Sequence, residues 1–266
     1  MKQDEIKTIQ MESPQRVRGL TMTGMSIMGT RQYQQDTYYM ISARRGSLAV
    51  ICDGMGGMEC GEVASKVAVE KLVGDFEAWE DEESPTAFLQ KEAGRMDQVV
   101  AGIADAQGDR LDTGTTVVSV IIQDNSLYWL SVGDSRIYVL RGEEMLCVTQ
   151  DHNYELRLRR QLQTGEITQE EYDQKSDQKE ALISYLGMDG LELVDSNVRP
   201  LILLSGDRIL LCSDGLYKCL PEEKIKNLLM NRDSEVKDIV EDLLHAVEEE
   251  PRKNKDNTTV ILLEYR

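Results

Sequence analysis

The sequence has few histidines and lacks paired cysteines, long apolar runs and a secretory signal, each of which would indicate another class of protein. Only two histidines are present, His152 and His245, and the five cysteines lack the paired spacing of a zinc site or a disulfide framework. No stretch of about 18 uninterrupted apolar residues is present, so the sequence predicts no membrane insertion. Residues 1–19 lack the apolar core of a secretory signal. Together these absences lead us to expect a cytoplasmic protein.

Basic residues are also in the minority. The 266 residues include 30 Lys and Arg against 48 Asp and Glu, which gives a formal net charge of −18. Nucleic acids and anionic membrane surfaces are bound by basic faces, so this balance argues against both as partners. With 41% apolar residues, the chain has enough to bury for a sizeable core. Cys52, Cys147 and Cys212 lie in or beside strand-like runs, where we expect buried thiols.

Hydrophobic patterning predicts one α+β domain over residues 18–266, preceded by a mobile tail, residues 1–17, that ends in an edge strand. Strands are expected over 48–52, 115–122, 127–132, 136–140, 208–212 and 258–263. Helices are expected over 63–72, 86–107, 154–163, 178–186, 221–230 and 234–248. Turns at Asp124-Asn125 and Gly133-Asp134-Ser135 predict an antiparallel meander from 115 to about 148.

Aspartates at the ends of apolar strands are the most informative feature. Four of them follow, precede or separate strand-like runs: Asp53, Asp134, Asp214 and Asp256. Strands that end at one rim of a sheet would bring these carboxylates into a small volume, where a cation must compensate their charge. An all-oxygen set of ligands favours Mg²⁺, Mn²⁺ or Ca²⁺ over zinc or copper.

Other interpretations compete for the same residues. A single Asp after a strand is most often a turn residue or a helix cap. The run Asp53-Gly-Met-Gly-Gly57 could bind phosphate, but no Lys-Ser/Thr follows it, so the P-loop interpretation fails. Its glycines would instead let a carbonyl such as that of Gly54 approach a metal. A Ca²⁺-binding structural domain finds little support, because the sequence contains no EF-hand loop.

The order of these motifs resembles the metal-dependent Ser/Thr protein phosphatases of type 2C, in particular their bacterial branch. The resemblance covers about residues 20–264 and rests on seven pieces in the family's order: Gly29–Asp36, Asp53–Gly57 with Gly61–Ala64, Thr113–Thr116, Val132–Arg136, Gln150–His152, Cys212–Leu216 and Asp256–Val260. Each piece alone is weak, and the seven together are specific. The resemblance implies a four-layer α-β-β-α sandwich with two central, mainly antiparallel sheets and metals at one end of them.

Carried over position by position, the resemblance implies a centre of two Mn²⁺ or Mg²⁺ ions. Asp53 would bridge both ions and the carbonyl of Gly54 would bind one of them. Asp214 and Asp256 would bind the other. Such a centre hydrolyses phosphoserine and phosphothreonine by direct attack of a water that bridges the two metals, without a covalent enzyme intermediate. No further cofactor is implied.

Two further residues would act on the water and the substrate. Asp36 matches a position that orients metal-bound water, and Arg31 matches the arginine that grips the substrate phosphate. A guanidinium suits that role because its planar fork matches two phosphate oxygens. Together with the metal ligand Asp53, these residues form the predicted catalytic set.

Two positions depart from the family's pattern. Met55 stands where eukaryotic members have a histidine that is a candidate general acid, so the proton source is open. Lys218 stands where bacterial members have an Asp that shares a third metal with the position of Asp134. An ammonium would repel a cation there and pair with Asp134, so we expect weak or absent binding of a third ion.

The segment 153–180 corresponds to the family's flap beside the active site. Its first part is basic, with Arg157, Arg159 and Arg160, and its second part is acidic and polar. Such loops carry substrate preference, so the basic part either meets a phosphopeptide or forms an ordinary solvated helix.

The sequence therefore predicts a monomeric metal-dependent Ser/Thr protein phosphatase. Its expected substrates are phosphorylated proteins, the products of a bacterial Ser/Thr kinase. The alternative is a pseudophosphatase, a regulatory module that binds a phosphoprotein without turnover. Lys218 favours that alternative, whereas Asp53, Asp214, Asp256 and Arg31 favour the enzyme.

Overall fold

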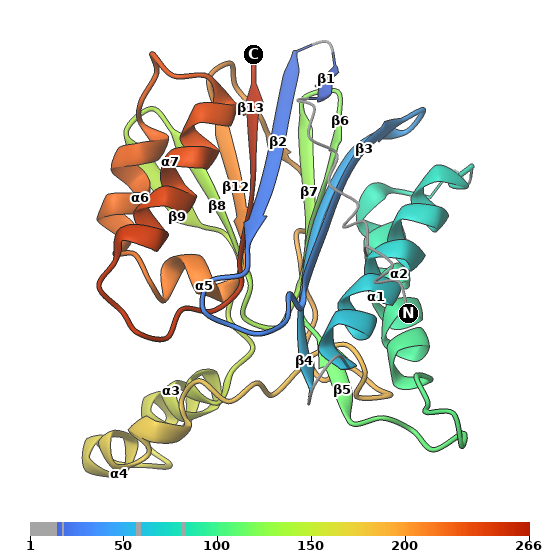
Figure 1. Cartoon of the computed structure of the whole chain (residues 1–266), viewed down its shortest axis with the longest axis vertical. Helices are drawn as coiled ribbons and strands as arrows, with labels where there is room; N and C mark the ends of the chain where they lie inside the picture. Colours follow the sequence, from blue (N-terminus) through green and yellow to red (C-terminus); the bar gives the residue numbers. More distant parts are fainter. Residues whose placement is uncertain (1–14, 18, 57–59, 81–82) are drawn as a thin grey trace, which may run out of the picture.

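Two antiparallel sheets lie face to face in the middle of the molecule, and helices cover the outer face of each (Figure 1). This computed structural model describes residues 15–17, 19–56, 60–80 and 83–266. The predicted four-layer α-β-β-α sandwich is confirmed. Gly57 and residues 1–14 of the expected mobile tail lie outside the described residues.

The first sheet has the strand order β1-β2-β13-β12-β8-β9. Its strands are β1 (Gln15–Val17), β2 (Leu20–Ile27), β8 (Arg136–Arg141), β9 (Glu144–Cys147), β12 (Arg208–Cys212) and β13 (Thr258–Tyr265). The second sheet has the order β10-β7-β6-β4-β3, with β11 paired to β7 and β5 paired to β4. Its strands are β3 (Asp36–Ala43), β4 (Gly46–Gly56), β5 (Thr113–Thr115), β6 (Val117–Gln123), β7 (Ser126–Val132), β10 (Asp195–Ser196) and β11 (Leu201–Ile202). We call them the β13 sheet and the β4 sheet.

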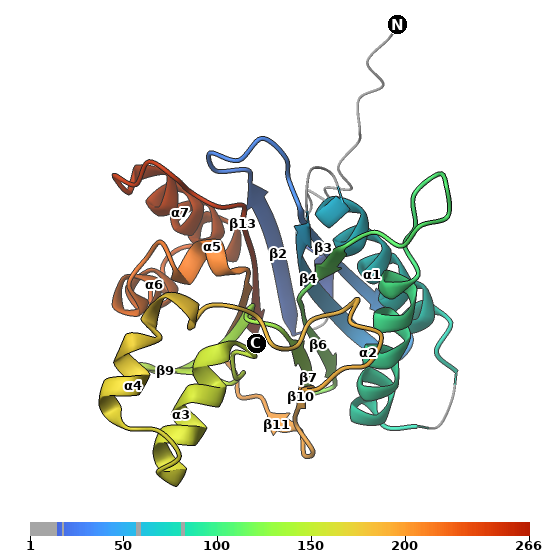
Figure 2. The ribbon, with the colours of Figure 1, turned by 90° about the horizontal axis from the view of Figure 1, so that it is seen from below.

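Each sheet carries its own helices. The helices α1 (Cys60–Glu77) and α2 (Pro85–Ala101) pack on the β4 sheet. The helices α5 (Asp214–Tyr217), α6 (Glu222–Leu229) and α7 (Val236–Glu249) lie on the β13 sheet. The helices α3 (Tyr154–Thr164) and α4 (Gln169–Gln174), with a short 3₁₀ helix at Ser176–Gln178, stand away from the sandwich (Figures 1 and 2). Among the helices described, none is long and apolar enough to cross a membrane.

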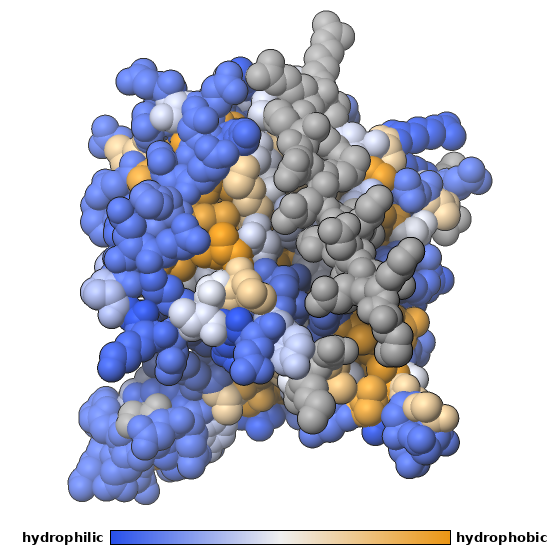
Figure 3. Space-filling view, in the orientation of Figure 1, coloured by the Kyte–Doolittle hydropathy of each residue, from blue (hydrophilic) through white to orange (hydrophobic). Residues whose placement is uncertain are grey.

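The core consists of three buried layers, one between the sheets and one under each helical cover. Strand β4 shows how alternation builds them, because successive side chains of a strand point to opposite faces. Leu48, Val50 and Cys52 pack under α1 and α2, whereas Ala49 and Ile51 pack between the two sheets. The α3–α4 segment contributes little to these layers, and the face of it that Figure 3 shows is mostly hydrophilic.

The predicted meander from 115 to 148 is wrong in one place. Strands β6 and β7 form the expected hairpin around Asp124-Asn125, and β8 pairs with β9. However, β7 belongs to the β4 sheet and β8 to the β13 sheet, so the chain crosses between the sheets at Gly133–Ser135. A hairpin and a crossing have the same local alternation of apolar residues, and packing of the two sheets decides between them.

Other local expectations also need correction. The predicted helix over 178–186 is wrong: the segment consists of turns and bends, in which Leu182 and Leu186 form isolated bridges to Asn153 and Thr115. A capping box between Thr168 and Glu171 starts α4, a short helix that was not predicted. Strands β2 and β3 were not expected at all. Cys147 is exposed on the edge strand β9, whereas Cys52 and Cys212 are buried as predicted.

Candidate metal centre

The predicted aspartates stand where strands of both sheets end. Asp36 begins β3 and is paired in register with Asp53 of β4. Asp214 begins α5 directly after β12, and Asp256 precedes β13 by two residues. The β4 sheet therefore supplies Asp36 and Asp53, and the β13 sheet supplies Asp214 and Asp256. These chain segments meet in the lower half of the sandwich (Figure 1).

Hydroxyl groups from the β13 sheet hold Asp36 across this junction. Ser213 Oγ and Thr259 Oγ1 both donate to Asp36 Oδ2, at 2.8 and 2.7 Å. The other oxygen, Oδ1, is buried and has no hydrogen-bond partner within the described part of the chain. Burial raises the pKa of Asp36 to about 7, and repulsion from Asp214 adds to the rise, although the two hydroxyl bonds oppose it.

A close approach of backbone places Asp214 beside the start of β13. A Cβ added to Gly215 would lie 2.1 Å from the carbonyl oxygen of Asn257, so no side chain fits there. The Asn257 side chain in turn accepts from the Gln35 backbone N–H at 2.8 Å and donates to the Met28 carbonyl at 2.9 Å. Asn257 thereby fixes the β2–β3 link, which carries Arg31, against the segment that carries Asp256.

Asp53 lies at the middle of the carboxylate cluster. Its pKa is raised well above the ordinary value, first by loss of water and then by repulsion from nearby carboxylates. Those carboxylates are Asp36, Asp214, Asp134 and Asp256. Four negative groups around a fifth are unfavourable without a cation, so the site chemistry matches a receptor for a hard, oxygen-preferring metal ion.

The backbone around Asp53 and Gly54 is held by threonines of β5 and the residue after it. Thr115 Oγ1 and the Thr116 N–H both donate to the Asp53 carbonyl at 2.9 Å. Gly54 donates its N–H to the Gln35 carbonyl at 3.1 Å. These contacts fix the direction of the strand end, so the carboxylate of Asp53 is presented from a rigid backbone.

Two basic side chains compensate part of the negative charge. Arg31 Nη2 lies 2.5 Å from Asp256 Oδ2. Lys218 Nζ lies 2.7 Å from Asp214 Oδ2 and 3.2 Å from Asp134 Oδ2, so the expected ion pair with Asp134 is present. As the side chains stand, no three His, Cys, Asp or Glu residues of the described chain are close enough together to form a set of metal ligands.

Asp134 occupies the crossing between the sheets, not a hairpin. Its neighbour Gly133 donates its N–H to His152 Nδ1 at 3.2 Å and accepts from the His152 N–H at 2.9 Å. Burial raises the pKa of Asp134 to about 6, with further repulsion from Asp214 and an opposing attraction to Lys218. Tyr217 Oη donates to the Asp134 carbonyl at 2.9 Å.

Sequence reasoning named the carboxylates but not the residues that hold them. Ser213, Thr115, Thr116 and Thr259 were not predicted to act in the site. The signal was available, because each of them belongs to one of the motif pieces on which the resemblance rests. Their roles became visible only when the contacts across the two sheets were known.

A comparison of the sequence with known families decides its affiliation. The sequence profile of protein phosphatase 2C matches residues 23–257. The chain belongs to the protein phosphatase 2C family. The prediction of a Ser/Thr protein phosphatase is thereby confirmed at the level of the family, whose members depend on metal ions.

Individual relatives agree with this affiliation. The serine/threonine phosphatase stp of Listeria innocua is 33% identical over 225 residues, which cover 82% of this chain and 84% of the relative. The crystal structure of the serine/threonine phosphatase Stp1 from Staphylococcus aureus is similar with a TM-score of 0.78 at 27% identity, covering 97% of this chain and 98% of that one. Both are bacterial proteins, as the predicted resemblance to the bacterial branch requires.

A further similar structure contains metal ions. The catalytic domain of the serine/threonine protein phosphatase PstP, solved with two manganese ions, has a TM-score of 0.71 and 26% identity. The similarity covers 92% of this chain and 97% of that one. The two manganese ions belong to that structure.

Proposed function

We propose that this protein hydrolyses phosphoserine and phosphothreonine in proteins by direct attack of water, without a covalent phosphoenzyme. The observation that carries the proposal is the gathering of Asp36, Asp134, Asp214 and Asp256 around Asp53, whose pKa is raised first by burial and then by these carboxylates. Relatives at 33% identity that are named serine/threonine phosphatases support the same activity.

The residues present fit a centre for two Mn²⁺ or Mg²⁺ ions. Their donor atoms are all oxygens, and the buried Asp36 Oδ1 has no partner among the described residues. In this proposal Asp53 would bridge the ions, the Gly54 carbonyl would bind one, and Asp214 and Asp256 would bind the other. Two hard cations so held lower the pKa of water and neutralise charge that develops on phosphorus.

Three side chains of the protein would then act on substrate and water. Asp36 is fixed by Ser213 and Thr259 through one carboxylate oxygen, which leaves Oδ1 to accept a hydrogen bond from water. Arg31 is more than half exposed on the β2–β3 link and would bind the substrate phosphate through its guanidinium fork. Asp53 presents its carboxylate from the rigid end of β4.

Lys218 limits the number of ions in this proposal. Its ammonium lies 3.2 Å from Asp134, the carboxylate that would face a third ion, and 2.7 Å from Asp214. Attraction to Asp214 and Asp134 raises the pKa of Lys218 despite the opposing effect of burial, so the group stays charged. We therefore propose that a third ion binds weakly or not at all.

The remaining parts of the proposal concern partners and domain organisation. We propose that residues 18–266 form one domain, that 153–180 act as a flap, and that the protein is a monomer in the cytoplasm. Its substrates would be proteins phosphorylated by a Ser/Thr kinase. Neither the relatives nor the described contacts support the alternative of a pseudophosphatase.

Hydrolysis of p-nitrophenyl phosphate and of a phosphothreonine peptide tests the activity. We expect turnover of both with Mn²⁺ and its loss with EDTA. Asp53→Asn should lower kcat by about a thousandfold or more, because the central carboxylate is removed. Asp238→Asn, the same change at an exposed site in α7, should match the wild type. Wild-type activity in Asp53→Asn, or full activity in EDTA, would overturn the proposal.

A further inference from the structure

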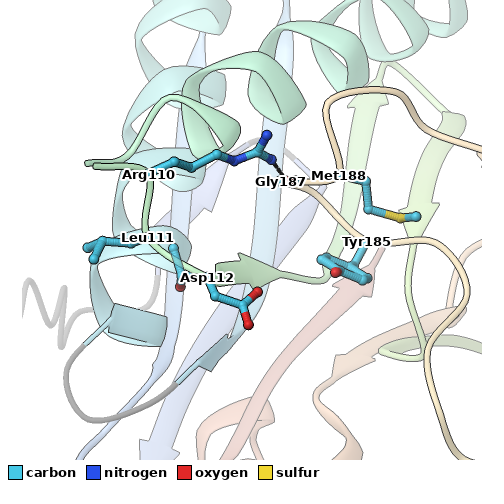
Figure 4. Close-up of a pocket in the computed structure, with 7 residues that line it drawn as sticks. Arg110, Leu111, Asp112, Tyr185, Gly187 and Met188 are labelled. Atoms are coloured by element: carbon cyan, nitrogen blue, oxygen red, sulfur yellow. Dashed lines mark hydrogen bonds between the residues drawn. The ribbon is translucent and has the colours of Figure 1, made fainter. Parts of the chain in front are cut away.

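A cavity of about 340 Å³ lies next to β5, at the end of β4 that follows Asp53, and is not used by the proposed chemistry. Its lining comes from two segments, residues 110–113 that lead into β5 and residues 185–188 that follow the flap (Figure 4). This volume is at the lower end of the range for ligand pockets, about 300–1,000 Å³, so it suits a single side chain better than a cofactor.

The register of β5 on β4 places this cavity near the cluster. Thr113 is paired with Gly56, three residues along β4 from Asp53. Three residues of extended chain span roughly 10 Å. A substrate whose phosphoresidue lies at Asp53 would therefore bring a residue about two to four positions away over the cavity.

The wall formed by residues 185–188 is held in place. A Cβ added to Gly114 would lie 2.5 Å from the Tyr185 ring, so the glycine is what lets this ring rest on β5. The Gly187 N–H donates to the buried Asp97 of α2 at 2.8 Å, and the Gly187 carbonyl accepts from Arg110. The cavity is thus preformed, which reduces the entropy lost when a ligand binds.

The lining carries one guanidinium, Arg110, and one carboxylate, Asp112, and only the carboxylate is without a partner among the described residues. Arg110 is engaged by the Gly187 carbonyl and lies 4.0 Å from Asp189. The carboxylate of Asp112 is exposed and, within the described chain, has no hydrogen-bond or ion-pair partner. Figure 4 shows this carboxylate and the Tyr185 ring on neighbouring sides of the cavity. A carboxylate next to an aromatic face is a suitable receptor for an ammonium or guanidinium group.

We infer that this cavity binds a lysine or arginine side chain of the phosphoprotein substrate, so that Asp112 and Tyr185 are specificity-determining residues. The inference rests on the proposed function and adds a substrate class to it, phosphoproteins with a basic residue near the phosphoresidue. The net charge of −18 favours the same class, because a basic flank offsets the repulsion between the protein and phosphate.

Paired phosphothreonine peptides test the inference. Each pair is identical except for Lys or norleucine at one position, two to four residues from the phosphothreonine. For the wild type, we expect kcat/KM to be about fivefold higher for the best-placed Lys peptide than for its norleucine partner. For Asp112→Asn, we expect kcat/KM to be about equal for the two peptides. Tyr185→Phe should keep the preference because the ring remains, and Tyr185→Ala should weaken it. Asp109→Asn, the same change of charge on the same loop but outside the cavity lining, should keep it.

Two controls separate this inference from the proposed function. Hydrolysis of p-nitrophenyl phosphate, which is too small to reach the cavity, should be unchanged in Asp112→Asn. Fluorescence anisotropy of the labelled peptides measures their binding independently of turnover. A Lys preference that is absent from the wild type in both assays, or that persists in Asp112→Asn, overturns the inference. If the wild type does not hydrolyse p-nitrophenyl phosphate, that result would overturn the proposed function instead.

Discussion

Lys218 Nζ lies 2.7 Å from Asp214 Oδ2, four residues back along the chain, and the same ammonium reaches Asp134 on the crossing between the sheets. The protein thus carries a fixed positive charge beside the carboxylates of its candidate metal centre. Glu180 of the flap, 3.6 Å away, is a third and more exposed partner of this ammonium.

Replacing this charge should change the number of ions bound. Lys218→Asp removes the ammonium and adds a carboxylate opposite Asp134, so we expect about one more Mn²⁺ per protein than in the wild type. Equilibrium dialysis with metal analysis measures the stoichiometry directly. Lys224→Asp is the control. Lys224 lies on α6 and pairs with Glu250, so its replacement should leave the stoichiometry unchanged. An unchanged stoichiometry in Lys218→Asp would contradict the role given to Lys218.

Removing the central charge should stabilise the metal-free protein. The pKa of Asp53 is raised, so its ionised form is disfavoured by the fold, and that penalty grows as pH rises above the ordinary pKa. In EDTA at pH 8, Asp53→Asn should therefore have a higher Tm than the wild type. Adding Mn²⁺ should raise the Tm of the wild type and not that of the variant. A lower Tm for Asp53→Asn in EDTA would show that the carboxylate has a stabilising role.

A second buried acid, remote from the site, should make stability depend on pH. Burial raises the pKa of Glu92 in α2 from 4.5 to about 7, helped by a hydrogen bond to Asp75 and repulsion from it. Between pH 4.5 and about 7, the folded protein therefore binds more protons at Glu92 than the unfolded chain does. The contribution of protonated Glu92 to the free energy of unfolding is complete below about pH 4.5 and is lost as pH rises through 7.

Glu92→Gln should remove that loss. At pH 8 we expect the variant to be more stable than the wild type by about 1–3 kcal/mol, and the gain should vanish near pH 4.5. Urea unfolding at several pH values measures the difference. Glu70→Gln, at an exposed position in α1, should show no such dependence. A gain that stays constant with pH would argue for improved packing instead.

Position 215 should not tolerate even the smallest side chain, that of alanine. In Gly215→Ala the new Cβ would meet the Asn257 carbonyl oxygen, so either α5 or the start of β13 must move. We expect a loss of stability of about 2–4 kcal/mol and a large fall in kcat. Gly74→Ala in α1 is the matched control, because nothing lies within 4 Å of its Cβ, and it should stabilise by about 0.5–1 kcal/mol.

The sequence predicted the elements whose pattern is strong and local. Apolar runs such as Leu48–Cys52 and the helical face of Val236–Val247 were recognised, because burial imposes a clear period on them. The strand β2 was missed because Gly24 and Ser26 interrupt the apolar face that Leu20 and Met22 begin, and because its partner strand β13 is more than 200 residues away in the chain. The irregular segment after Gln178 has apolar residues at helical spacing, and bridges from Leu182 to Asn153 and from Leu186 to Thr115 override that preference.

The candidate site was predictable as a list of residues and not as an arrangement. The aspartates were named because strand ends and motif order identify them. The sheet to which each belongs was hidden, because the crossing at Asp134 looks like an ordinary turn in the sequence. The engagement of Arg31 by Asp256 joins segments 225 residues apart, on which local patterns carry no information, whereas the pair of Lys218 with Asp214 spans only four residues.

The division of the aspartates between the two sheets has a mechanical consequence. Asp36 and Asp53 move with one sheet and Asp214 and Asp256 with the other, so any sliding of the sheets past each other shears the cluster. The apolar layer between the sheets includes Met22, Ile51 and Ile261. Its close packing therefore limits how far the aspartates of one sheet can move relative to those of the other. Substitutions deep in that layer, with no contact to substrate, are a place where selection could tune the rate of this enzyme.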